Sequence, residues 1–248
     1  MALATADRTT VDETEIARFN ALAATWWDDT GPMRPLHEIG PARLAFIRDR
    51  VLEHFSRPAG PHPFEGLAML DVGCAAGLVT EPLARLGAAV TGIDAAVANI
   101  GAARAHAEQS GLAITYHAMT AEGLALEGRT FDVVTALEIV EHVADVPLFM
   151  ASLARLVRPG GLLIMSTLNR TAKSFALAVV GAEYVLRWLP RGTHDWRKFI
   201  TPAELARHME EAGFTPGAAT GLRLDLMTRR WVLSGDVAVN YLMAASKS

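Results

Sequence analysis

The chain lacks the features that mark several common classes of protein. Its 248 residues include a single cysteine, Cys74, which excludes an internal disulfide and a zinc site built from several cysteines. The formal net charge is −4 and lysines and arginines do not cluster, so no nucleic-acid partner is expected. No secretory signal is visible, and no apolar run reaches the roughly 20 residues that a membrane span needs. We therefore expect a cytoplasmic protein, whose contact with a membrane surface is a separate question.

Apolar segments typical of strands alternate along the chain with segments of helical periodicity. The expected strands are residues 68–72, 89–93, 114–117, 131–137 and 162–167, followed by two β-rich runs at 219–226 and 237–244. Helices are expected at 78–86, 97–110, 146–157 and from Thr201, where Thr201-Pro-Ala-Glu204 forms a capping box. This alternation predicts an α/β fold, Rossmann-like, with a doubly wound, mostly parallel, seven-stranded sheet.

The residues before this pattern are predicted to form an N-terminal helical cap. One helix is expected over 12–28 and a second over 41–55, with Pro32 and Pro35 breaking the chain between them. A stretch rich in proline and glycine follows. The predicted division is a cap and linker at 1–63 and a main domain at 64–248. Within the main domain, residues 169–200 interrupt the alternation after the fifth strand, and we expect an insertion at the ligand-binding edge of the sheet.

The stretch 69–77, Met-Leu-Asp-Val-Gly-Cys-Ala-Ala-Gly, is typical of a strand that ends in a nucleotide-binding turn. Asp94 ends the next strand about 20 residues past Gly73, a spacing at which a carboxylate accepts hydrogen bonds from ribose hydroxyls; the simpler alternative is a helix cap. The turn has Gly73 and Gly77 but lacks the middle glycine that lets a pyrophosphate approach. This absence disfavours a nicotinamide oxidoreductase and favours a nucleoside without phosphates, such as S-adenosylmethionine. The pattern indicates a methyltransferase.

A polar cluster, Glu138, Glu141 and His142, follows the fourth expected strand. In a helix this spacing places all three side chains on one face, where two carboxylates and an imidazole can ligate a divalent cation. Alternatively His142 acts alone as a general base, or the segment only caps and packs the turn. Arg43, on the second expected helix, is suited to pair with the methionine carboxylate of the cofactor, and a solvated surface charge is the simpler interpretation.

The segment 173–191, inside the expected insertion, has an amphipathic pattern. On a helical wheel the charged side chains of Lys173, Glu183, Arg187 and Arg191 share one side, and apolar side chains cover the rest. This pattern suits a helix that lies at a membrane interface. It suits a lid packed over an active site equally well.

Taken together, these features resemble the bacterial ubiquinone-biosynthesis O-methyltransferases, a family of class I S-adenosylmethionine enzymes. The resemblance runs along nearly the whole chain, through residues 19–28 with the paired tryptophans, 35–37, 43–44, 70–74, 138–143, 156–161, 166–170, 179–184, 192–195 and 239–241. The glycine turn and the Glu-His segment occur widely among class I methyltransferases. Val-Val-Gly-Ala-Glu-Tyr at 179–184 and Gly-Thr-His-Asp at 192–195 are much more specific.

The resemblance implies cofactor contacts at Arg43, Gly73, Asp94 and Leu137. It implies transfer of the methyl group to catechol-type hydroxyls of polyprenylated aromatic intermediates, at both O-methylation steps of ubiquinone synthesis. The chain departs from the family at two positions of the turn, where alanines stand in place of the usual glycines, and Leu137 stands where methionine is common. We expect Leu137 to pack against adenine nonetheless.

The resemblance also bears on metal and membrane. Eukaryotic members of the family use magnesium at the positions of Glu138, Glu141 and His142, so Mg²⁺ is an open alternative to a lone histidine base. The family's insertion is associated with anionic phospholipid membranes, which implies contact through 173–191, a peripheral location at the inner membrane, and other ubiquinone-biosynthesis enzymes as candidate partners.

Two rival functions stay open on the sequence. A soluble methyltransferase that acts on another small phenol or acid predicts no binding to lipid vesicles. A non-catalytic cofactor-binding protein that assembles partners at the membrane predicts cofactor binding without turnover.

Overall fold

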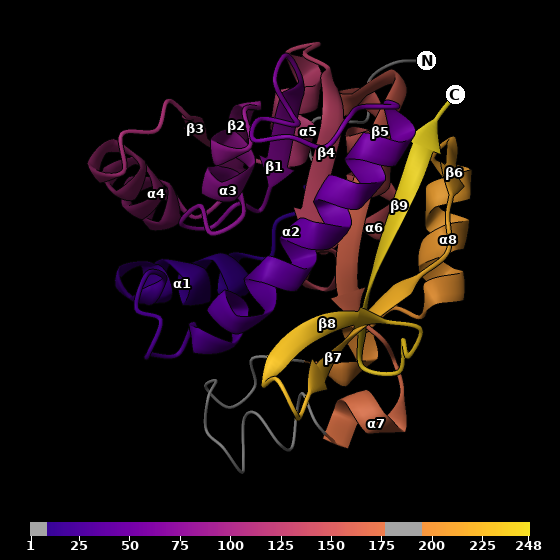
Figure 1. The fold of residues 1–248 in the computed structure, drawn as a ribbon. Helices are drawn as coiled ribbons and strands as arrows, with labels where there is room; N and C mark the ends of the chain where they lie inside the picture. Colours follow the sequence, from indigo (N-terminus) through magenta and orange to yellow (C-terminus); the bar gives the residue numbers. More distant parts are fainter. Residues whose placement is uncertain (1–8, 177–194) are drawn as a thin grey trace.

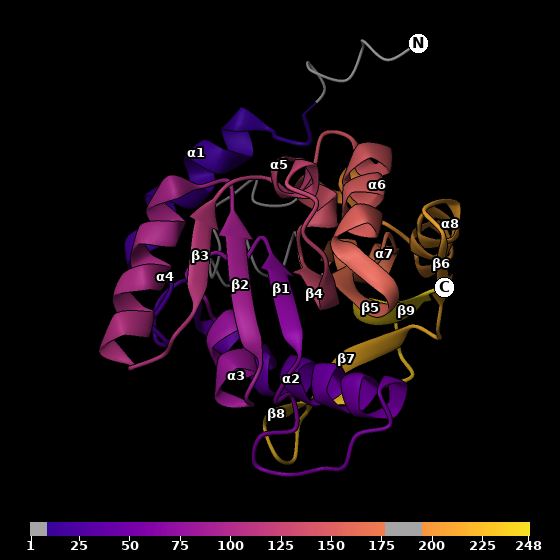
Figure 2. The same cartoon turned by 90° about the horizontal axis from the view of Figure 1, so that it is seen from above.

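The centre of the molecule is a mixed sheet with helices on both faces (Figures 1 and 2). The structure is a computed structural model that describes residues 9–176 and 195–248. Five parallel strands stand in the spatial order β3-β2-β1-β4-β5. Their bounds are β1 Ala68–Val72, β2 Ala89–Asp94, β3 Thr115–Ala118, β4 Phe131–Leu137 and β5 Val157–Leu168. The order reverses between β1 and β4, so the predicted doubly wound α/β fold is confirmed.

Antiparallel strands extend the sheet beyond β5. The strand β9 Asn240–Lys247 pairs with β5, and β7 Thr220–Asp225, β8 Arg230–Ser234 and β6 Phe214–Pro216 follow on this side. The described residues therefore contain nine strands, and the predicted number of seven was wrong. Two strands were missed: β6 has only three residues, too few for a hydrophobic period to stand out, and none of the residues of β8 is fully buried.

The N-terminal helices differ from the prediction in one respect. The helix α1 Glu13–Leu22 and the short 3₁₀ helix η1 Ala23–Thr25 occupy the first expected helix. The helix α2 runs over Arg34–His54, seven residues earlier than the expected start at 41. Pro35 lies in its first turn, where the missing N–H costs nothing, so the break expected at this proline was wrong. Pro41 lies inside the helix rather than at its beginning.

Helices cover the two faces of the sheet in separate layers (Figure 2). On one face are α5 Ala121–Leu126, α6 Val146–Leu156 and α8 Pro202–Glu211, packed on a core that includes Leu70 and Val134. On the other face, α2 and α3 Thr80–Arg85 pack on a core that includes Met69 and Val133. Neighbouring strand residues thus enter opposite cores, which is why the parallel strands are continuously apolar.

Two further helices complete the fold near the edge and the end of the parallel strands. The helix α4 Val97–Gln109 connects β2 to β3 and packs beside α1 (Figure 1). The short helix α7 Ala172–Ser174 follows β5. Among the described residues, no helix is long and apolar enough to cross a membrane. Most of the segment 173–191 lies outside the described residues.

Candidate active site

The glycine turn, residues 73–77, leaves the sheet at the end of β1. Gly73 has a φ of +70°, and a Cβ on it would lie 2.5 Å from Cδ1 of Ile139. Gly77 has a φ of +93°, and a Cβ there would lie 2.5 Å from the Tyr116 hydroxyl oxygen. Both glycines picked out in the sequence therefore occupy positions from which a side chain is excluded by backbone conformation and by space.

Asp94 ends β2 directly beside this turn. Its Oδ2 accepts a hydrogen bond from the Ala75 N–H at 2.9 Å, and its Oδ1 accepts one from the Ala96 N–H at 2.7 Å. Burial raises the pKa of Asp94, against the opposing effect of these two N–H groups. The carboxylate thus joins the turn to the start of α4. Because each carboxylate oxygen can accept more than one hydrogen bond, contact with a ribose remains compatible with this arrangement.

Asp71 lies beneath the turn, in β1. Its two oxygens accept hydrogen bonds from the hydroxyls of Thr80 and Thr135, each at 2.7 Å. The two threonines therefore hold this carboxylate beneath the turn. Burial raises the pKa of the Asp71 carboxyl to about 6.

Arg43 reaches the carboxyl end of β4 from α2. Its Nη2 donates to Glu138 Oε1 at 2.7 Å, and the Ser166 hydroxyl donates to the same oxygen at 2.8 Å. The Arg43 side chain is buried, and its Nε has no hydrogen-bond partner. A buried guanidinium with a free N–H suits a carboxylate ligand, and this one lies at the same edge of the sheet as the glycine turn. The interpretation of Arg43 as a solvated surface charge is wrong, because the side chain is buried. Leu137, the last residue of β4, is half-buried next to Glu138.

The expected metal set does not share one helical face. Glu138 has a φ of +51°, and only Val140–His142 form a helical turn, the 3₁₀ helix η2. Glu138 binds Arg43, whereas Glu141 accepts a hydrogen bond from the Thr167 hydroxyl at 2.9 Å. Within the described ranges, no three His, Cys, Asp or Glu side chains come together as a metal site. In this arrangement the three residues do not fit a cation, because their side chains turn to different partners.

His142 is bound by a residue that the sequence patterns did not single out. Its Nδ1 lies 3.1 Å from Glu15 Oε2, and its ring contacts Phe19 edge-on at 5.4 Å between centroids. Burial alone would lower the pKa of His142, but the hydrogen bond to Glu15 and the nearby Glu141 carboxylate outweigh it and the pKa is raised. The pKa of Glu141 is itself raised by burial and by the neighbouring Glu138. The result is an imidazole held between carboxylates at the ligand edge.

The N-terminal segment crosses this edge and is fixed to it at several points. The Thr10 N–H and hydroxyl donate to the two oxygens of Glu122 at 2.9 and 2.8 Å, at the start of α5. The Ala144 N–H donates to the Thr10 carbonyl at 3.0 Å. These contacts place residues from the start of the chain over the carboxyl ends of β3 and β4.

The paired tryptophans pack rather than line an open pocket. Trp26 is buried and its Nε1 donates to Asn99 Oδ1 at 3.0 Å. Trp27 stacks on His106 with ring centroids 3.4 Å apart, and its Nε1 donates to the Ala76 carbonyl at 3.0 Å. Trp27 therefore ties the helical cap to the glycine turn.

Sequence reasoning missed Glu15, Ser166 and Thr167 as partners of the polar cluster. Ser166 and Thr167 lie in the stretch 166–170 that contributes to the family resemblance, and this resemblance could have pointed to them as site residues. Glu15 has none, since the pairing spans 127 positions and depends on where α1 docks.

Comparisons with known proteins agree with this geometry. A family model described as a methyltransferase domain matches residues 43–219. The ubiquinone biosynthesis O-methyltransferase of Azorhizobium caulinodans is 54% identical over 235 residues, which cover 94% of this chain and 93% of the relative. That of Methylobacterium nodulans is 52% identical over 238 residues and covers 96% of both chains.

Solved structures share the fold at much lower identity. The magnesium protoporphyrin IX methyltransferase from Synechocystis PCC 6803 with bound SAH has a TM-score of 0.63 and 19% identity, covering 96% of this chain and 100% of that one. The same enzyme with bound SAM has a TM-score of 0.60 and 18% identity, covering 97% and 100%. The chain therefore belongs to the ubiquinone biosynthesis O-methyltransferases and is an S-adenosylmethionine-dependent methyltransferase.

Proposed function

We propose that the chain methylates catechol-type hydroxyls of polyprenylated aromatic intermediates of ubiquinone biosynthesis, at both O-methylation steps. The observation that carries the proposal is the identity of 52–54% over 94–96% of the chain to proteins named for this pathway. Identity of this level over almost the full length includes the regions that differ most between class I methyltransferases of different substrates.

We assign the cofactor to the edge formed by the glycine turn, Asp94 and Arg43. Gly73 lets the backbone approach the cofactor, Asp94 accepts hydrogen bonds from the ribose hydroxyls, and Leu137 packs against adenine. Arg43 binds the methionine carboxylate, for which its unpartnered Nε is available. Bound S-adenosylmethionine supplies an electrophilic methyl group on a sulfonium centre.

We propose that His142 is the general base that accepts the proton of the reacting hydroxyl. A hydroxyl oxygen that forms a bond to the methyl carbon must give up its proton, and the imidazole at the ligand edge can accept it. Glu15 keeps the ring oriented through Nδ1, which leaves Nε2 for the substrate. The chain's remaining contribution is to hold the hydroxyl in line with the methyl group.

The alternative route to deprotonation is a magnesium ion at Glu138, Glu141 and His142. In that case Glu138 has to leave Arg43 and Glu141 has to turn away from Thr167, because both are engaged in the present arrangement. The lone histidine requires no such rearrangement, and we prefer it for that reason.

We also propose that residues 1–63 act as a cap over the cofactor and that 173–191 contacts an anionic phospholipid membrane. The cap assignment is supported by the bonds of Thr10 to Glu122 and of Trp27 to Ala76. The membrane assignment is supported by the amphipathic pattern of the segment and by a substrate whose prenyl tail partitions into lipid.

The decisive experiment is methyl transfer from labelled S-adenosylmethionine to a short-chain polyprenyl catechol, with magnesium and with a chelator. We expect product in both conditions, and loss of product in His142→Asn with cofactor affinity retained. Product only with magnesium assigns the chemistry to the metal instead. Tight cofactor binding without product on this catechol, but with product on an unprenylated phenol or acid, would overturn the substrate assignment.

A further inference from the structure

The tip of the β7–β8 hairpin carries the most exposed large apolar side chains of residues 9–176 and 195–248. Leu226 and Met227 are 82% and 95% exposed, and Leu224 on β7 is 41% exposed. Leu226 and Met227 are large apolar side chains that are little covered by the described residues. Exposed apolar groups gathered on one projecting turn are characteristic of an interaction site.

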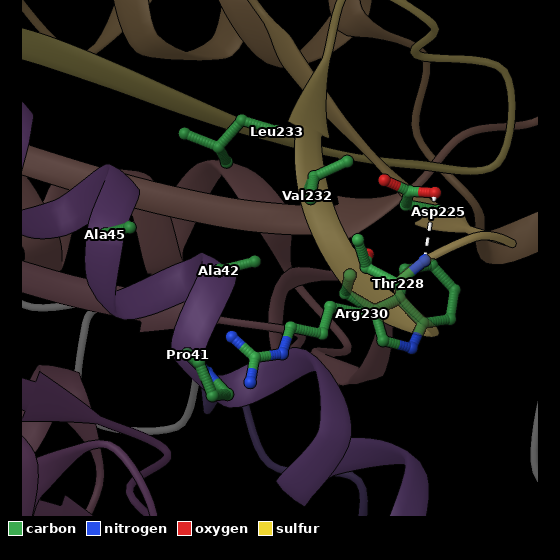
Figure 3. A pocket seen from close by; sticks show the side chains of 9 residues that line it. Pro41, Ala42, Ala45, Asp225, Thr228, Arg230, Val232 and Leu233 are labelled. Atoms are coloured by element: carbon green, nitrogen blue, oxygen red, sulfur yellow. Dashed lines mark hydrogen bonds between the residues drawn. The ribbon is translucent and has the colours of Figure 1, made fainter.

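The turn that presents these side chains is well defined. Asp225 Oδ1 accepts hydrogen bonds from the N–H groups of Met227 and Thr228 at 2.9 and 3.4 Å, the second of which is drawn in Figure 3. Next to the turn, Trp231 pairs with Leu224 and packs against the core between α2 and the sheet. The turn therefore lies beside α2, and the hairpin holds Leu226 and Met227 out toward solvent.

Basic residues surround the apolar tip. Arg223, Arg229 and Arg230 are exposed, and Asp225 is the one acidic residue between positions 223 and 230. The hairpin is thus cationic on a chain whose formal net charge is −4. An anionic surface attracts this element and repels the rest of the molecule, which selects one orientation.

The hairpin projects past the edge of the sheet at which the candidate active site lies. The last residue of β5, Leu168, pairs with Asn240, the first residue of β9. The strand β7 pairs with β9 only at Thr220 and Gly221 and then continues beyond the end of β9. Figure 1 shows the hairpin at the same end of the molecule as α7, which directly follows β5.

From these observations we infer that the β7–β8 hairpin is a lipid-docking element that inserts Leu226 and Met227 into an anionic membrane surface. Two apolar side chains on a convex turn are far too few for a stable protein interface, which buries about 800 Å² on each partner. They are sufficient for an interfacial anchor when cationic side chains lie beside them, because apolar burial and attraction to anionic lipid add together.

This docking would serve the proposed function, on which its biological meaning rests. The prenylated substrate resides in the lipid, and the hairpin would hold the ligand edge of the sheet against that lipid. A groove of about 730 Å³ lies between α2 and the turn end of the hairpin, and the Arg230 side chain extends along it toward Pro41 (Figure 3). Arg230 thus lies between the tip and the helix that carries Arg43.

Vesicle sedimentation with the full chain tests the inference. Wild-type protein should bind phosphatidylglycerol-containing vesicles and bind pure phosphatidylcholine vesicles more weakly. Leu226→Ser combined with Met227→Ser should reduce binding at least about tenfold, since each buried side chain of this size is worth more than a factor of ten. Arg223→Gln combined with Arg230→Gln should remove the preference for anionic vesicles. Arg229 stays unchanged because its φ of +54° belongs to the turn.

Leu126→Ser is the matched control, because Leu126 is 76% exposed at the end of α5, outside the hairpin. Wild-type-like binding of the hairpin variant, or an equal loss in the control, overturns the inference. So does complete loss of binding in Trp188→Ser/Leu189→Ser with no effect of the hairpin variant. A change from dimer to monomer in sedimentation velocity, with vesicle binding unaffected, would assign the tip to a second copy of the chain.

Methyl transfer to the short-chain polyprenyl catechol without vesicles separates this inference from the proposed function. The hairpin variant should match wild type in that assay. If neither protein gives product, the proposed function fails, while the vesicle result still decides the docking role.

Discussion

At the scale of single residues, the two alanines of the glycine turn differ in their backbone strain. Ala75 adopts a φ of +47°, in the left-handed region that glycine occupies without strain, whereas Ala76 does not appear among the residues with positive φ. The family resemblance places glycines at both positions, and only one of them is required by the backbone. Replacement of the family's glycines by alanine therefore strains the backbone only at Ala75.

Ala75→Gly should raise the free energy of unfolding by up to about 1 kcal/mol. Relief of the left-handed conformation, about 1–2 kcal/mol, exceeds the added chain entropy of a glycine, about 0.4–1 kcal/mol. Urea denaturation measures the change. Ala76→Gly is the control, expected to lower stability by about 1 kcal/mol because it adds only entropy and a small void. Equal destabilisation by both changes would contradict the role of backbone strain.

At the scale of elements, α1 influences the protonation of His142, the base that we propose. Glu15 belongs to α1 and His142 to η2, so the position of the helix decides how readily the imidazole takes up a proton. The pKa of Glu15 is lowered, first by its hydrogen bond to His142. The two groups therefore stabilise each other in charged form.

Glu15→Gln should move the acidic limb of the kcat/KM profile to lower pH by about 1 unit, since an adjacent carboxylate typically shifts a pKa by 1–3 units. The carboxylate holds the pKa of His142 up, and the base acts only when it is neutral, so removing the charge frees the imidazole at lower pH. Glu13→Gln, an exposed position on the same helix, should leave the profile unchanged. An unshifted acidic limb in Glu15→Gln would remove His142 from the role of base.

The helices and strands also show which features of the fold could be predicted from the sequence. The strand at 131–137 and the capping box at Thr201 match the structure, because a continuous apolar run and a side-chain cap are local signals. The helix α5 was not predicted, because its six residues complete fewer than two turns and include a glycine, which lowers the helical signal. Pro35 was read as a break because a proline carries no mark of whether it begins a helix or interrupts one.

At the scale of the whole molecule, buried carboxyls under the sheet's ligand edge link stability to pH. Asp71 has a pKa of about 6 in the folded protein against an ordinary value of 3.8. The folded state therefore binds more protons between these values, so this group costs stability above pH 6 and the cost disappears below about pH 4. Such a carboxyl is retained at the expense of stability.

Asp71→Asn should stabilise the protein more at pH 7 than at pH 4, with the two differences separated by about 3 kcal/mol. The neutral amide keeps an acceptor for one threonine hydroxyl and has no charge to bury. Unfolding by urea at both pH values measures this, and Asp29→Asn at an exposed turn provides the control. A gain independent of pH would show that the effect comes from packing and not from titration.

The sequence by itself determined the alternating α/β order, the glycine turn with Asp94, and the family. These follow from apolar periods, backbone conformation and short spacings, which act between neighbours in the chain. Only the tertiary structure decided that Arg43 binds Glu138, that Glu15 binds His142, and that Leu226 and Met227 project from a cationic hairpin. Each of these depends on how distant elements dock, because a side chain's partner and exposure are set by packing across the fold and not by the residues beside it.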